Sequence, residues 1–391
     1  MSENFGTGGQ SATTTNHQVE RPAGIISKQE LPTDESFGAL EPVAYFDGAM
    51  PTGVTVSQKG RIFVNFPRWG YDVPFTVAEI RGGKPVAYPD EAVNQSRLDD
   101  QAAAFISVQS VVIDPADRLW ILDTGSPMFQ PTKYGGPKLV CVDLATNRII
   151  KKILFPQEVA LPTTYLNDVR FDLRRGNEGM AFITDSADTG PNGIIVVDLE
   201  DGESWRRLHD HPSTKAEGLQ GFLPIVEGRP FLEHQQDGSV KPGAGMGADG
   251  IAISADGTRL YYCPLGSRKL YSVMTEALAD REVDDSVTDE GDKGGAADGL
   301  ESDAAGYIYS TNYEHNAILR RRFPEGQWET VVHDARLRWP DTLSLATDGY
   351  LYVTANQLHR QARFHQGRDL RRKPYVLFRI HVNAQPVMLK K

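Results

Sequence analysis

A unit that recurs six times constrains the fold of this chain more than any other feature of its sequence. Each copy has a polar residue, a short alternating apolar run, a turn rich in Asp and Gly, and a second alternating run with aromatic or branched residues. The copies are PTGVTVSQKGRIFVNF from Pro51, VQSVVIDPADRLWILDTG from Val108, LNDVRFDLRRGNEGMAFITDS from Leu166, ADGIAISADGTRLYYCPLGS from Ala248, ADGLESDAAGYIYSTNYEHN from Ala297 and PDTLSLATDGYLYVTANQLH from Pro340. Alternation with a period of two around such a turn predicts a strand, a tight turn and a second strand.

The spacing between copies leaves room for two further strands in each unit. The segments LVCVDLATNRIIKKILF and IIVVDLEDGESWRRLHD have the pattern expected of these outer hairpins. Four strands in each of six units predict an all-β, six-bladed β-propeller over residues 40–391, with an open solenoid or two stacked β domains as the alternative. The longest gap, between the third and fourth copies, predicts an insertion around residues 209–245, which is either a lid over one face or a decorative loop.

The N-terminal segment and the two cysteines each predict a local property of the chain. Residues 1–25 are rich in Gly, Ser, Thr and Asn, and this composition predicts a flexible N-terminal tail. The tail shows no basic n-region followed by an apolar h-region, so no signal peptide is visible, which favours the cytoplasm. Cys141 and Cys263 each lie in an apolar, strand-like run, which predicts two buried free thiols.

Charge and motif content exclude several classes of function. The 391 residues include 52 acidic and 41 basic side chains, a net charge of -11 that repels phosphate backbones, so we expect no nucleic-acid partner. No apolar run is long enough for a membrane span. GxSxG, P-loop and GxGxxG motifs do not occur in a strand-turn-helix context, which argues against a serine-triad hydrolase, an NTPase or a dinucleotide enzyme.

The first strand of each propeller blade lines the central channel, so the aligned starts of these strands converge there. The residues at these six positions, called the upper ring below, are Thr52, Gln109, Asn167, Asp249, Asp298 and Asp341. All six carry oxygen, and an Asn with two or three Asp could hold a divalent cation such as Ca²⁺. The same residues could instead open turns, or, without a cation, raise one another's pKa and serve acid–base catalysis. The sequence leaves these outcomes open.

Several segments of the chain resemble a known family. FVNFPRW at Phe63–Trp69, AYPD at Ala87–Asp90 and QSVVIDPADRLWILDTG at Gln109–Gly125 are similar to signature blocks of the yellow and major royal jelly protein family. The resemblance continues in family order through SWRRLH at Ser204–His209 to WPDT and ANQL, and covers about residues 40–360. The sequence looks like a bacterial relative of that family.

This resemblance implies a six-bladed propeller and a small aromatic or amine ligand in the central channel. Insect members of the family are secreted, and some convert dopachrome, so the resemblance implies tautomerase-like activity and export, and the compartment stays open. By resemblance, Asp341 and Thr342 in WPDT and Asn356 in ANQL contact the ligand. A tautomerisation needs only proton removal and return, so we expect Asp249 or Asp298 to be catalytic, with Gln109 and Asn167 holding the substrate oxygen.

Two other functions remain as alternatives. More distantly, the chain resembles gluconolactonase-like and regucalcin-like lactonases, and this likeness would make Asn167, Asp249 and Asp298 ligands of one divalent cation. Thr52 stands where those enzymes have an acidic residue, which leaves less charge to hold the cation. The third alternative is a non-enzymatic binding or structural protein.

Overall fold

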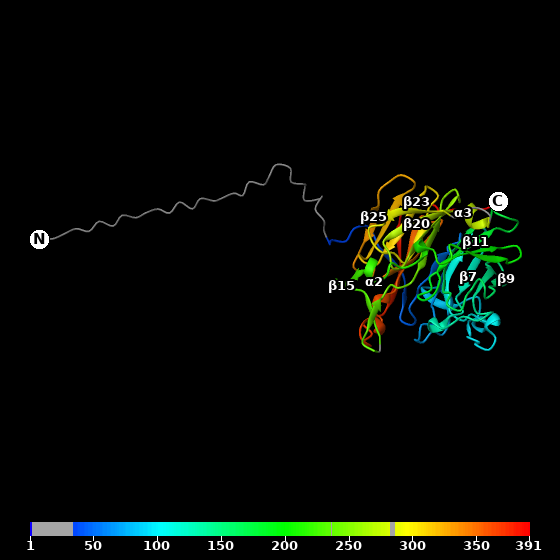
Figure 1. Ribbon diagram of the computed structural model, residues 1–391, viewed down its shortest axis with the longest axis horizontal. Helices are drawn as coiled ribbons and strands as arrows, with labels where there is room; N and C mark the ends of the chain where they lie inside the picture. Colours follow the sequence, from blue (N-terminus) through cyan, green and yellow to red (C-terminus); the bar gives the residue numbers. More distant parts are fainter. Residues whose placement is uncertain (2–33, 236, 282–285) are drawn as a thin grey trace. The chain divides into compact units, whose positions relative to one another are not determined.

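The structure is a computed structural model that describes residues 1, 34–235, 237–281 and 286–391. Apart from Met1, the tail predicted over residues 1–25 lies outside these ranges. The chain divides into two units, Met1–Glu35 and Ser36–Lys391, and the second holds all the described strands. Its main strands form six four-stranded antiparallel sheets, the blades of the predicted β-propeller (Figure 1).

The six blades follow one another along the chain. The first three are β2–β5 (Val54–Val56, Ile62–Asn65, Val77–Arg81, Lys84–Ala87), β6–β9 (Val108–Ile113, Leu119–Asp123, Lys138–Asp143, Arg148–Leu154) and β10–β13 (Leu166–Asp172, Met180–Asp185, Gly193–Asp198, Ser204–Arg207). The last three are β18–β21 (Ala248–Ile253, Arg259–Pro264, Lys269–Met274, Val287–Asp292), β22–β25 (Leu300–Ser302, Tyr307–Asn312, Ala317–Arg322, Glu329–His333) and β26–β28 with β1 (Pro340–Leu345, Tyr350–Ala355, Tyr375–His381, Glu41–Phe46). Both outer hairpins expected from the sequence are present, as β8–β9 and β12–β13.

The ring closes because the last blade contains strands from both ends of the propeller. The first strand of each blade contacts that of the next blade, and β26 contacts β2, so the six first strands surround the central axis. β1, from the N-terminal side of the propeller, is the outermost strand of the last blade and pairs with β28, with Ala44 opposite Leu377. This pairing joins residues from the two ends of the chain in one sheet.

An aspartate in the turn between the first two strands explains why the repeat folds locally as it does. In three blades one carboxylate oxygen accepts backbone N–H groups of the turn, as Asx turns do, and the other accepts a bond from an aromatic side chain of the second strand. These pairs are Asp114 with Trp120 at 2.8 Å, Asp303 with Tyr309 at 2.9 Å and Asp348 with Tyr352 at 2.9 Å.

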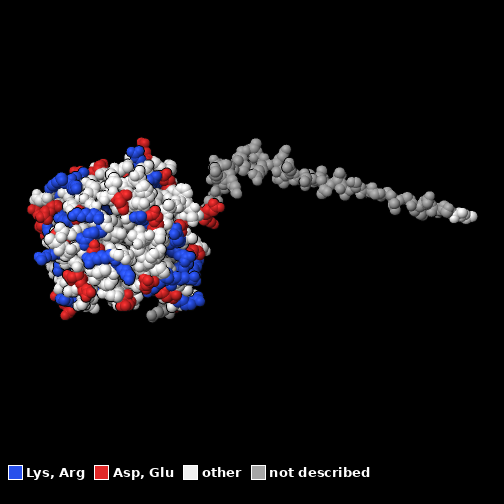
Figure 2. Space-filling model, turned by 180° about the vertical axis from the view of Figure 1, so that it is seen from behind, with Lys and Arg blue, Asp and Glu red and all other residues white. Residues whose placement is uncertain are grey.

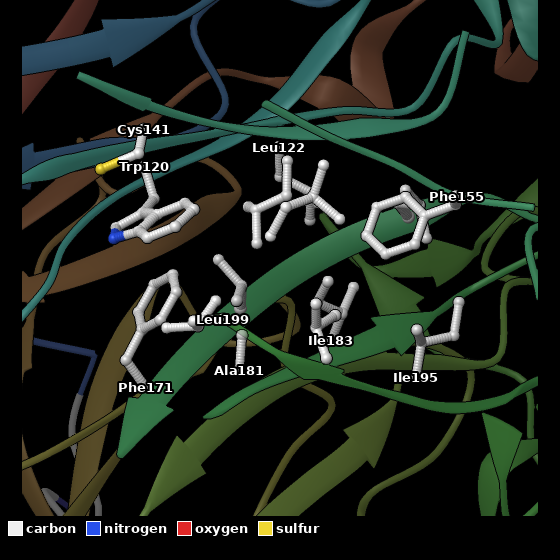
Figure 3. Close-up of a cluster of buried hydrophobic side chains, with 14 of the residues drawn as sticks. Trp120, Leu122, Cys141, Phe155, Phe171, Ala181, Ile183, Ile195 and Leu199 are labelled. Carbon is white, nitrogen blue, oxygen red and sulfur yellow. The ribbon is translucent and has the colours of Figure 1, made fainter. Parts of the chain in front are cut away.

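The hydrophobic core lies between neighbouring blades. Between the second and third blades, Trp120 and Phe171 stack with ring centroids 5.2 Å apart, in one cluster with Leu122 and Ile183 (Figure 3). Cys141 lies in the same cluster, and both it and Cys263 are buried free thiols, as the sequence predicts. Burial raises the pKa of Cys141 to about 12, so this thiol stays protonated near neutral pH.

The insertion between the third and fourth blades is built from short elements. They are η4 (Pro212–Thr214), α2 (Gly218–Gly221), and two small sheets of β14 (Ile225–Val226) with β15 (Arg229–Pro230) and β16 (Leu232–His234) with β17 (Val240–Pro242). The remaining short helices are α1 (Glu91–Asn94), α3 (Thr275–Ala279), η2 (Gln101–Ala103), η3 (Pro127–Phe129), η5 (Leu358–Arg360) and η6 (Ala362–Phe364). Phe231 of the insertion packs on Trp339 and Phe364, so the insertion covers residues that precede and follow the first hairpin of the last blade.

Charged side chains of both signs are interspersed over most of the face shown in Figure 2. Among the described helices, none has both the length and the apolar character that crossing a bilayer requires.

Candidate functional site

The upper ring places three aspartates together at one end of the central channel. Asp249, Asp298 and Asp341 are only 3%, 8% and 4% exposed, and each begins or precedes the first strand of its blade. The Asp249 and Asp298 carboxyl groups hydrogen-bond to each other, and the charge of Asp298 acts on both Asp249 and Asp341. Residues far apart in the sequence therefore form one acidic cluster, called the carboxyl cluster below.

Burial is the main electrostatic influence on the carboxyl cluster. It raises the pKa of Asp298 to about 6, although hydrogen bonds from Trp339 and Asp249 oppose the rise. Burial and the neighbouring charge of Asp298 hold the pKa of Asp249 and of Asp341 well above the usual range of an aspartate. Burial and mutual repulsion thus favour the protonated form of all three members of the cluster.

Neighbouring side chains fix the orientation of the cluster. Trp339 Nε1 donates to Asp298 Oδ2 at 2.5 Å, and Asn356 Nδ2 donates to Asp341 Oδ2 at 2.5 Å. Thr342 Oγ1 donates to Asp341 Oδ1 at 3.3 Å. Asn356 is fully buried and its other amide atom accepts the backbone N–H of Leu358, so the WPDT and ANQL blocks meet at Asp341. The ligand contacts predicted for Thr342 and Asn356 stay predictions.

Two of the other upper-ring residues, Gln109 and Asn167, are held by the protein in the same region. Tyr165 Oη donates to Gln109 Oε1 at 3.0 Å, and Trp69 Nε1 donates to Tyr165 Oη at 2.8 Å. Asn167 Nδ2 donates to Ser186 Oγ at 2.9 Å. Each of these bonds leaves further hydrogen-bonding capacity on the amide groups of Gln109 and Asn167.

Aromatic rings from separate loops form a wall beside this end of the channel. Trp69 stacks on Phe129 with centroids 5.5 Å apart, and Phe129 stacks on Tyr165 at 4.9 Å. Phe129 and Arg363 also line a cavity of about 230 Å³, whose other charged residues are Asp188, Glu233 and Lys241. The Arg363 guanidinium lies over the Phe129 ring at 5.4 Å. In this wall, formed by Trp69, Phe129 and Tyr165, it is Phe129 whose ring borders the cavity, where it can contact an aromatic molecule.

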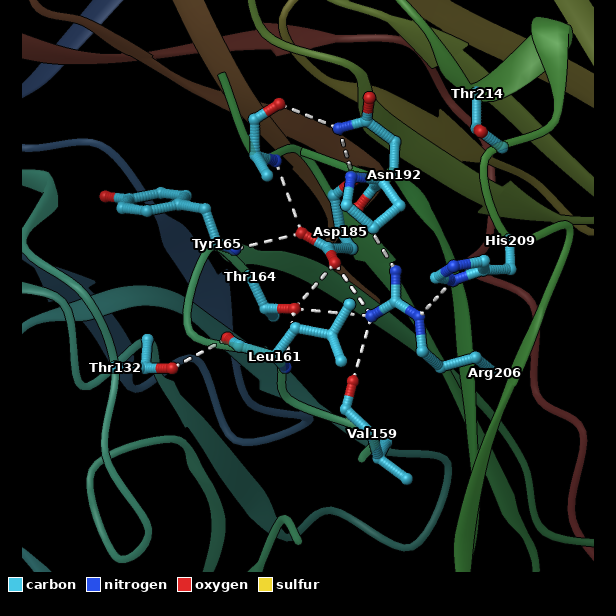
Figure 4. A network of polar contacts seen from close by, with 12 residues as sticks. Thr132, Val159, Leu161, Thr164, Tyr165, Asp185, Asn192, Arg206, His209 and Thr214 are labelled. Carbon is cyan, nitrogen blue, oxygen red and sulfur yellow. Dashed lines mark hydrogen bonds and ion pairs between the residues drawn. The ribbon is translucent and has the colours of Figure 1, made fainter. Parts of the chain in front are cut away.

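A buried ion pair positions Tyr165 in this wall (Figure 4). Asp185 accepts the backbone N–H of Tyr165 at 2.9 Å and the hydroxyl of Thr164 at 2.8 Å. Arg206 Nη1 lies 2.8 Å from Asp185 Oδ2 and also donates to the carbonyl oxygen of Val159. Since Asp185 ends β11 and Arg206 belongs to β13, the outer part of the third blade sets the position of an aromatic side chain beside the channel.

Two polar atoms near the wall have no hydrogen-bond partner. They are Tyr71 Oη and Arg363 Nε, both buried. The Tyr71 hydroxyl and the Arg363 guanidinium lie close enough for the charge of each to affect the pKa of the other, and both also interact with groups of the channel end, Asp341 with Tyr71 and Tyr165 with Arg363. Unsatisfied buried donors are costly, so this region offers bonds to a bound molecule.

The residues predicted to hold a metal have the donor types that Ca²⁺ prefers, but their arrangement does not show a cation site. Asp249 and Asp298 hydrogen-bond to each other, and Asn167 donates its amide to Ser186. Over residues 34–235, 237–281 and 286–391, no group of three or more His, Cys, Asp or Glu side chains is placed to hold a metal ion. The cation ligands named from the sequence stay a prediction.

Comparison with known proteins supplies the family. The profile of the family described as major royal jelly protein matches residues 106–383, which is more than half of the chain. The chain belongs to the major royal jelly protein family. Among curated members of this family, Protein yellow of Drosophila pseudoobscura pseudoobscura is 29% identical over 253 residues, covering 62% of this chain and 42% of the relative. Protein yellow of Drosophila melanogaster is 28% identical over 256 residues, covering 62% and 44%. The match thus spans less than half of these royal jelly family relatives.

Solved structures support the propeller fold of this royal jelly family member. A calcium-binding regucalcin from Agrobacterium tumefaciens superimposes with a TM-score of 0.55 at 14% identity, covering 89% of this chain and 95% of that one. A luciferin-regenerating enzyme gives 0.56 at 11% identity, covering 91% and 100%. A gluconolactonase from Xanthomonas campestris gives 0.50 at 12% identity, covering 90% and 98%. At these identities the likeness concerns the fold alone.

Some site residues follow from the sequence and some do not. Alignment of the repeats predicts the upper ring, including the carboxyl cluster. The aromatic wall and Arg363 were not predicted, because they lie outside the aligned positions. Trp69 belongs to the FPRW block, which was noted only as a family resemblance, and no sequence signal brings Phe129 and Arg363 to the channel.

Proposed function

We propose that this royal jelly family propeller binds a small aromatic or amine ligand at the end of the channel that holds the carboxyl cluster, and catalyses a tautomerisation of the dopachrome-conversion type. The observation that carries the proposal is the hydrogen-bonded pair of Asp249 and Asp298, buried beside a wall of stacked aromatic rings. The family match and the aromatic wall support the ligand class.

The chemistry assigned to the pair requires no redox step. Two carboxyl groups in contact cannot both ionise easily, so the pair holds one proton at neutral pH. The ionised member, Asp298, removes a proton from a carbon atom of the ligand, and Asp249 donates its proton to the oxygen that gains electron density. The ligand keeps its atoms and electrons, and one proton exchange between the two carboxyl groups restores the starting state.

The wall and the adjacent cavity define the ligand that fits. A cavity of about 230 Å³ lies below the range of about 300–1,000 Å³ that holds drug-sized molecules, so it suits a single-ring or fused-ring compound. The ring stacks beside Phe129, and an ammonium group pairs with Asp188 or Glu233, which line the same cavity. Because Asp249 and Asp298 are nearly inaccessible, the ligand reaches them when Phe231 of the insertion moves from Trp339.

The test combines binding with turnover. Dopamine is titrated by quenching of tryptophan fluorescence, and dopachrome consumption is followed by absorbance, in the wild type, Asp249→Asn, Asp298→Asn and the double variant. We expect the double variant to lose about 10²-fold or more of the turnover while it still binds dopamine. Asp201→Asn, at an exposed turn, is the matched control and keeps full turnover. Turnover by the double variant at the wild-type rate would refute the proposal.

A further inference from the structure

The central channel has a second chamber, three residues further along each first strand than the upper ring. The residues at this position are Thr55, Val112, Arg170, Ala252, Glu301 and Ser344. All of them except Ala252 line a cavity of about 90 Å³, called the lower chamber below. No member of the upper ring lines it. The lower chamber is therefore distinct from the site proposed above.

Arg170 extends from one first strand to another beside the lower chamber. Its Nη1 donates to Asp168 Oδ2 at 2.8 Å, and its Nη2 donates to the Leu300 carbonyl oxygen at 2.7 Å. The side chain thus reaches from β10 in the third blade to β22 in the fifth, past the fourth blade, which has the small residue Ala252 at this position. Asp168 also accepts a bond from Ser110 Oγ at 2.7 Å, so the position of Arg170 is fixed.

Two buried polar atoms of chamber-lining residues lack hydrogen-bond partners. Arg170 is 7% exposed, and its Nε has no hydrogen-bond partner, since Glu301 Oε1 is 3.9 Å away and too distant for a direct bond. Ser302 is 2% exposed, and its Oγ is also without a partner. Buried donors left unpaired cost free energy, and an inserted oxygen atom would satisfy them.

The charges of the lower chamber favour an uncharged occupant. Asp168 already neutralises Arg170 at 2.8 Å, and the two lining acids, Glu301 and Asp114, add no positive charge, so an anion gains little here. Asp114 is itself paired with Arg118 at 2.7 Å. The rest of the lining is mainly apolar and includes Phe171, Ile253, Leu345 and Val387. An ammonium group would have to leave water for this lining while the Arg170 guanidinium repels it.

We propose that the lower chamber is a second binding site, which takes a small neutral molecule carrying an amide group and a short apolar substituent. The amide carbonyl oxygen accepts a hydrogen bond from Arg170 Nε, and the amide N–H donates to the Glu301 carboxylate. The amide thereby bridges Arg170 Nε and Glu301 Oε1, which are 3.9 Å apart. The apolar substituent packs against the strand residues of the lining. The insertion does not contribute to this chamber, so its occupancy is independent of the proposed function.

One wall of the lower chamber comes from the C-terminal segment rather than from a blade. Pro386, Val387 and Met388 line the chamber. The segment is fixed on both sides, because Ala304 N donates to Gln385 O at 2.8 Å and Leu173 N donates to Leu389 O at 2.8 Å. A ligand that enters the chamber therefore contacts residues close to the end of the chain.

The experiment uses butyramide as the probe, with butyrate and butylamine as charged analogues of similar shape. Binding to the full chain is measured by ligand-observed NMR titration, and for a ligand of this size we expect a dissociation constant on the order of millimolar. Butyramide should bind saturably and at least about tenfold more tightly than either analogue. Equal binding of all three, or no saturable binding of butyramide, would overturn the proposal.

Variants locate the probe. Glu301→Leu keeps a similar volume but removes the acceptor, and it should weaken butyramide binding by about tenfold or more. Ser302→Ala removes the unpaired hydroxyl with little change of volume. It is the second chamber variant, used to test butyramide binding if Glu301→Leu does not fold. Asp298→Asn, in the carboxyl cluster, should leave butyramide binding unchanged. If binding falls in Asp298→Asn but not in the two chamber variants, butyramide occupies the upper site and the lower-chamber proposal fails. Dopachrome turnover by Glu301→Leu is measured separately, and it reports on the proposed function rather than on the lower chamber.

Discussion

The burial of Asp298 has a direct consequence for stability. Burial raises its pKa from 3.8 to about 6, so the folded protein holds this proton more tightly than the unfolded chain does. The contribution of Asp298 to stability is therefore greatest below about pH 4 and is lost as the pH rises through 6. An ionised carboxylate in this position costs stability, and the catalytic role proposed for Asp298 would account for its retention.

Asp298→Asn should accordingly stabilise the protein at pH 7.5. A shift of about two pKa units corresponds to about 3 kcal/mol, so the free energy of unfolding should rise by up to about that amount at pH 7.5 and change little at pH 4. Urea unfolding at the two pH values measures the difference. An Asn variant that is less stable than the wild type at pH 7.5 would show that the carboxylate is stabilising there.

The part of the site that could be predicted from the sequence is the part formed by residues at repeated positions. Asp249, Asp298 and Asp341 were predicted to converge because the propeller geometry follows from the repeat, and alignment within the repeat then assigns the channel position. The lower chamber has the same regularity at a spacing of three, but only Arg170 and Glu301 are charged there, so the pattern is weak. Phe129 and Arg363 lie on short helical turns whose course depends on tertiary contacts.

At the scale of elements, one acidic residue forms ion pairs between the insertion and the last blade. Glu227, between β14 and β15, lies 2.5 Å from Arg360 Nη2 and 3.3 Å from His359 Nε2. The nearby His359 ring and the hydrogen-bonded Arg360 guanidinium lower the pKa of Glu227 to about 2, although burial opposes the shift. The attachment is thus present above about pH 4.5 and weakens as the pH falls toward 2.

Glu227→Gln should loosen the insertion without unfolding the propeller. Removing the charge weakens the bonds to Arg360 and His359, so backbone hydrogen exchange in the insertion should become faster, while the blades keep their protection. Hydrogen-exchange mass spectrometry at pH 7 measures this. Glu329→Gln, which alters an exposed ion pair with Arg320, is the control. Unchanged exchange in the insertion of Glu227→Gln would mean that its other contacts, such as the packing of Phe231 and the bond of Arg229 to His365, are enough to hold it.

The sequence predicted the insertion's position but not its structure. Residues 209–245 are flanked by the third and fourth repeats, which made the insertion visible, whereas its two-residue strands have no periodicity to detect. The lid interpretation gains support from the packing of Phe231 on Trp339, because Trp339 also donates to Asp298.

For the molecule as a whole, closure of the ring depends on β1. Repeat alignment begins at Pro51, so the sequence did not predict that a strand before the first repeat completes the last blade. Phe46 at the end of β1 is 2% exposed and packs edge-on against Phe66 of the first blade with centroids 5.7 Å apart. The strand therefore contributes to the cores on both sides of the closure.

Phe46→Ala should destabilise the propeller by about 3–5 kcal/mol, because it leaves a cavity at the closure. Tyr45→Ala on the opposite face of the same strand is the control, since Tyr45 is 54% exposed, and its effect should stay within about 0.5 kcal/mol. Denaturant unfolding of both variants measures the two values. Equal effects would show that closure does not depend on the packing of Phe46.

The chemistry assigned to the whole molecule uses its own carboxyl groups. Chelation of divalent cations by EDTA should therefore leave dopachrome turnover unchanged within error. Loss of turnover with EDTA, restored by Ca²⁺, would instead support a cation bound by Asn167, Asp249 and Asp298, and would return attention to lactone substrates.

The most direct test of the central claim is the dependence of dopachrome turnover on pH, compared between the wild type and Asp298→Asn. If the buried pair transfers the proton, turnover by the wild type rises as the pH increases through about 6, where Asp298 ionises, and Asp298→Asn loses both this rise and most of the activity. A wild-type profile that is flat between pH 5 and 7, or an Asn variant with an unchanged profile, would contradict the assignment of Asp298 as the base.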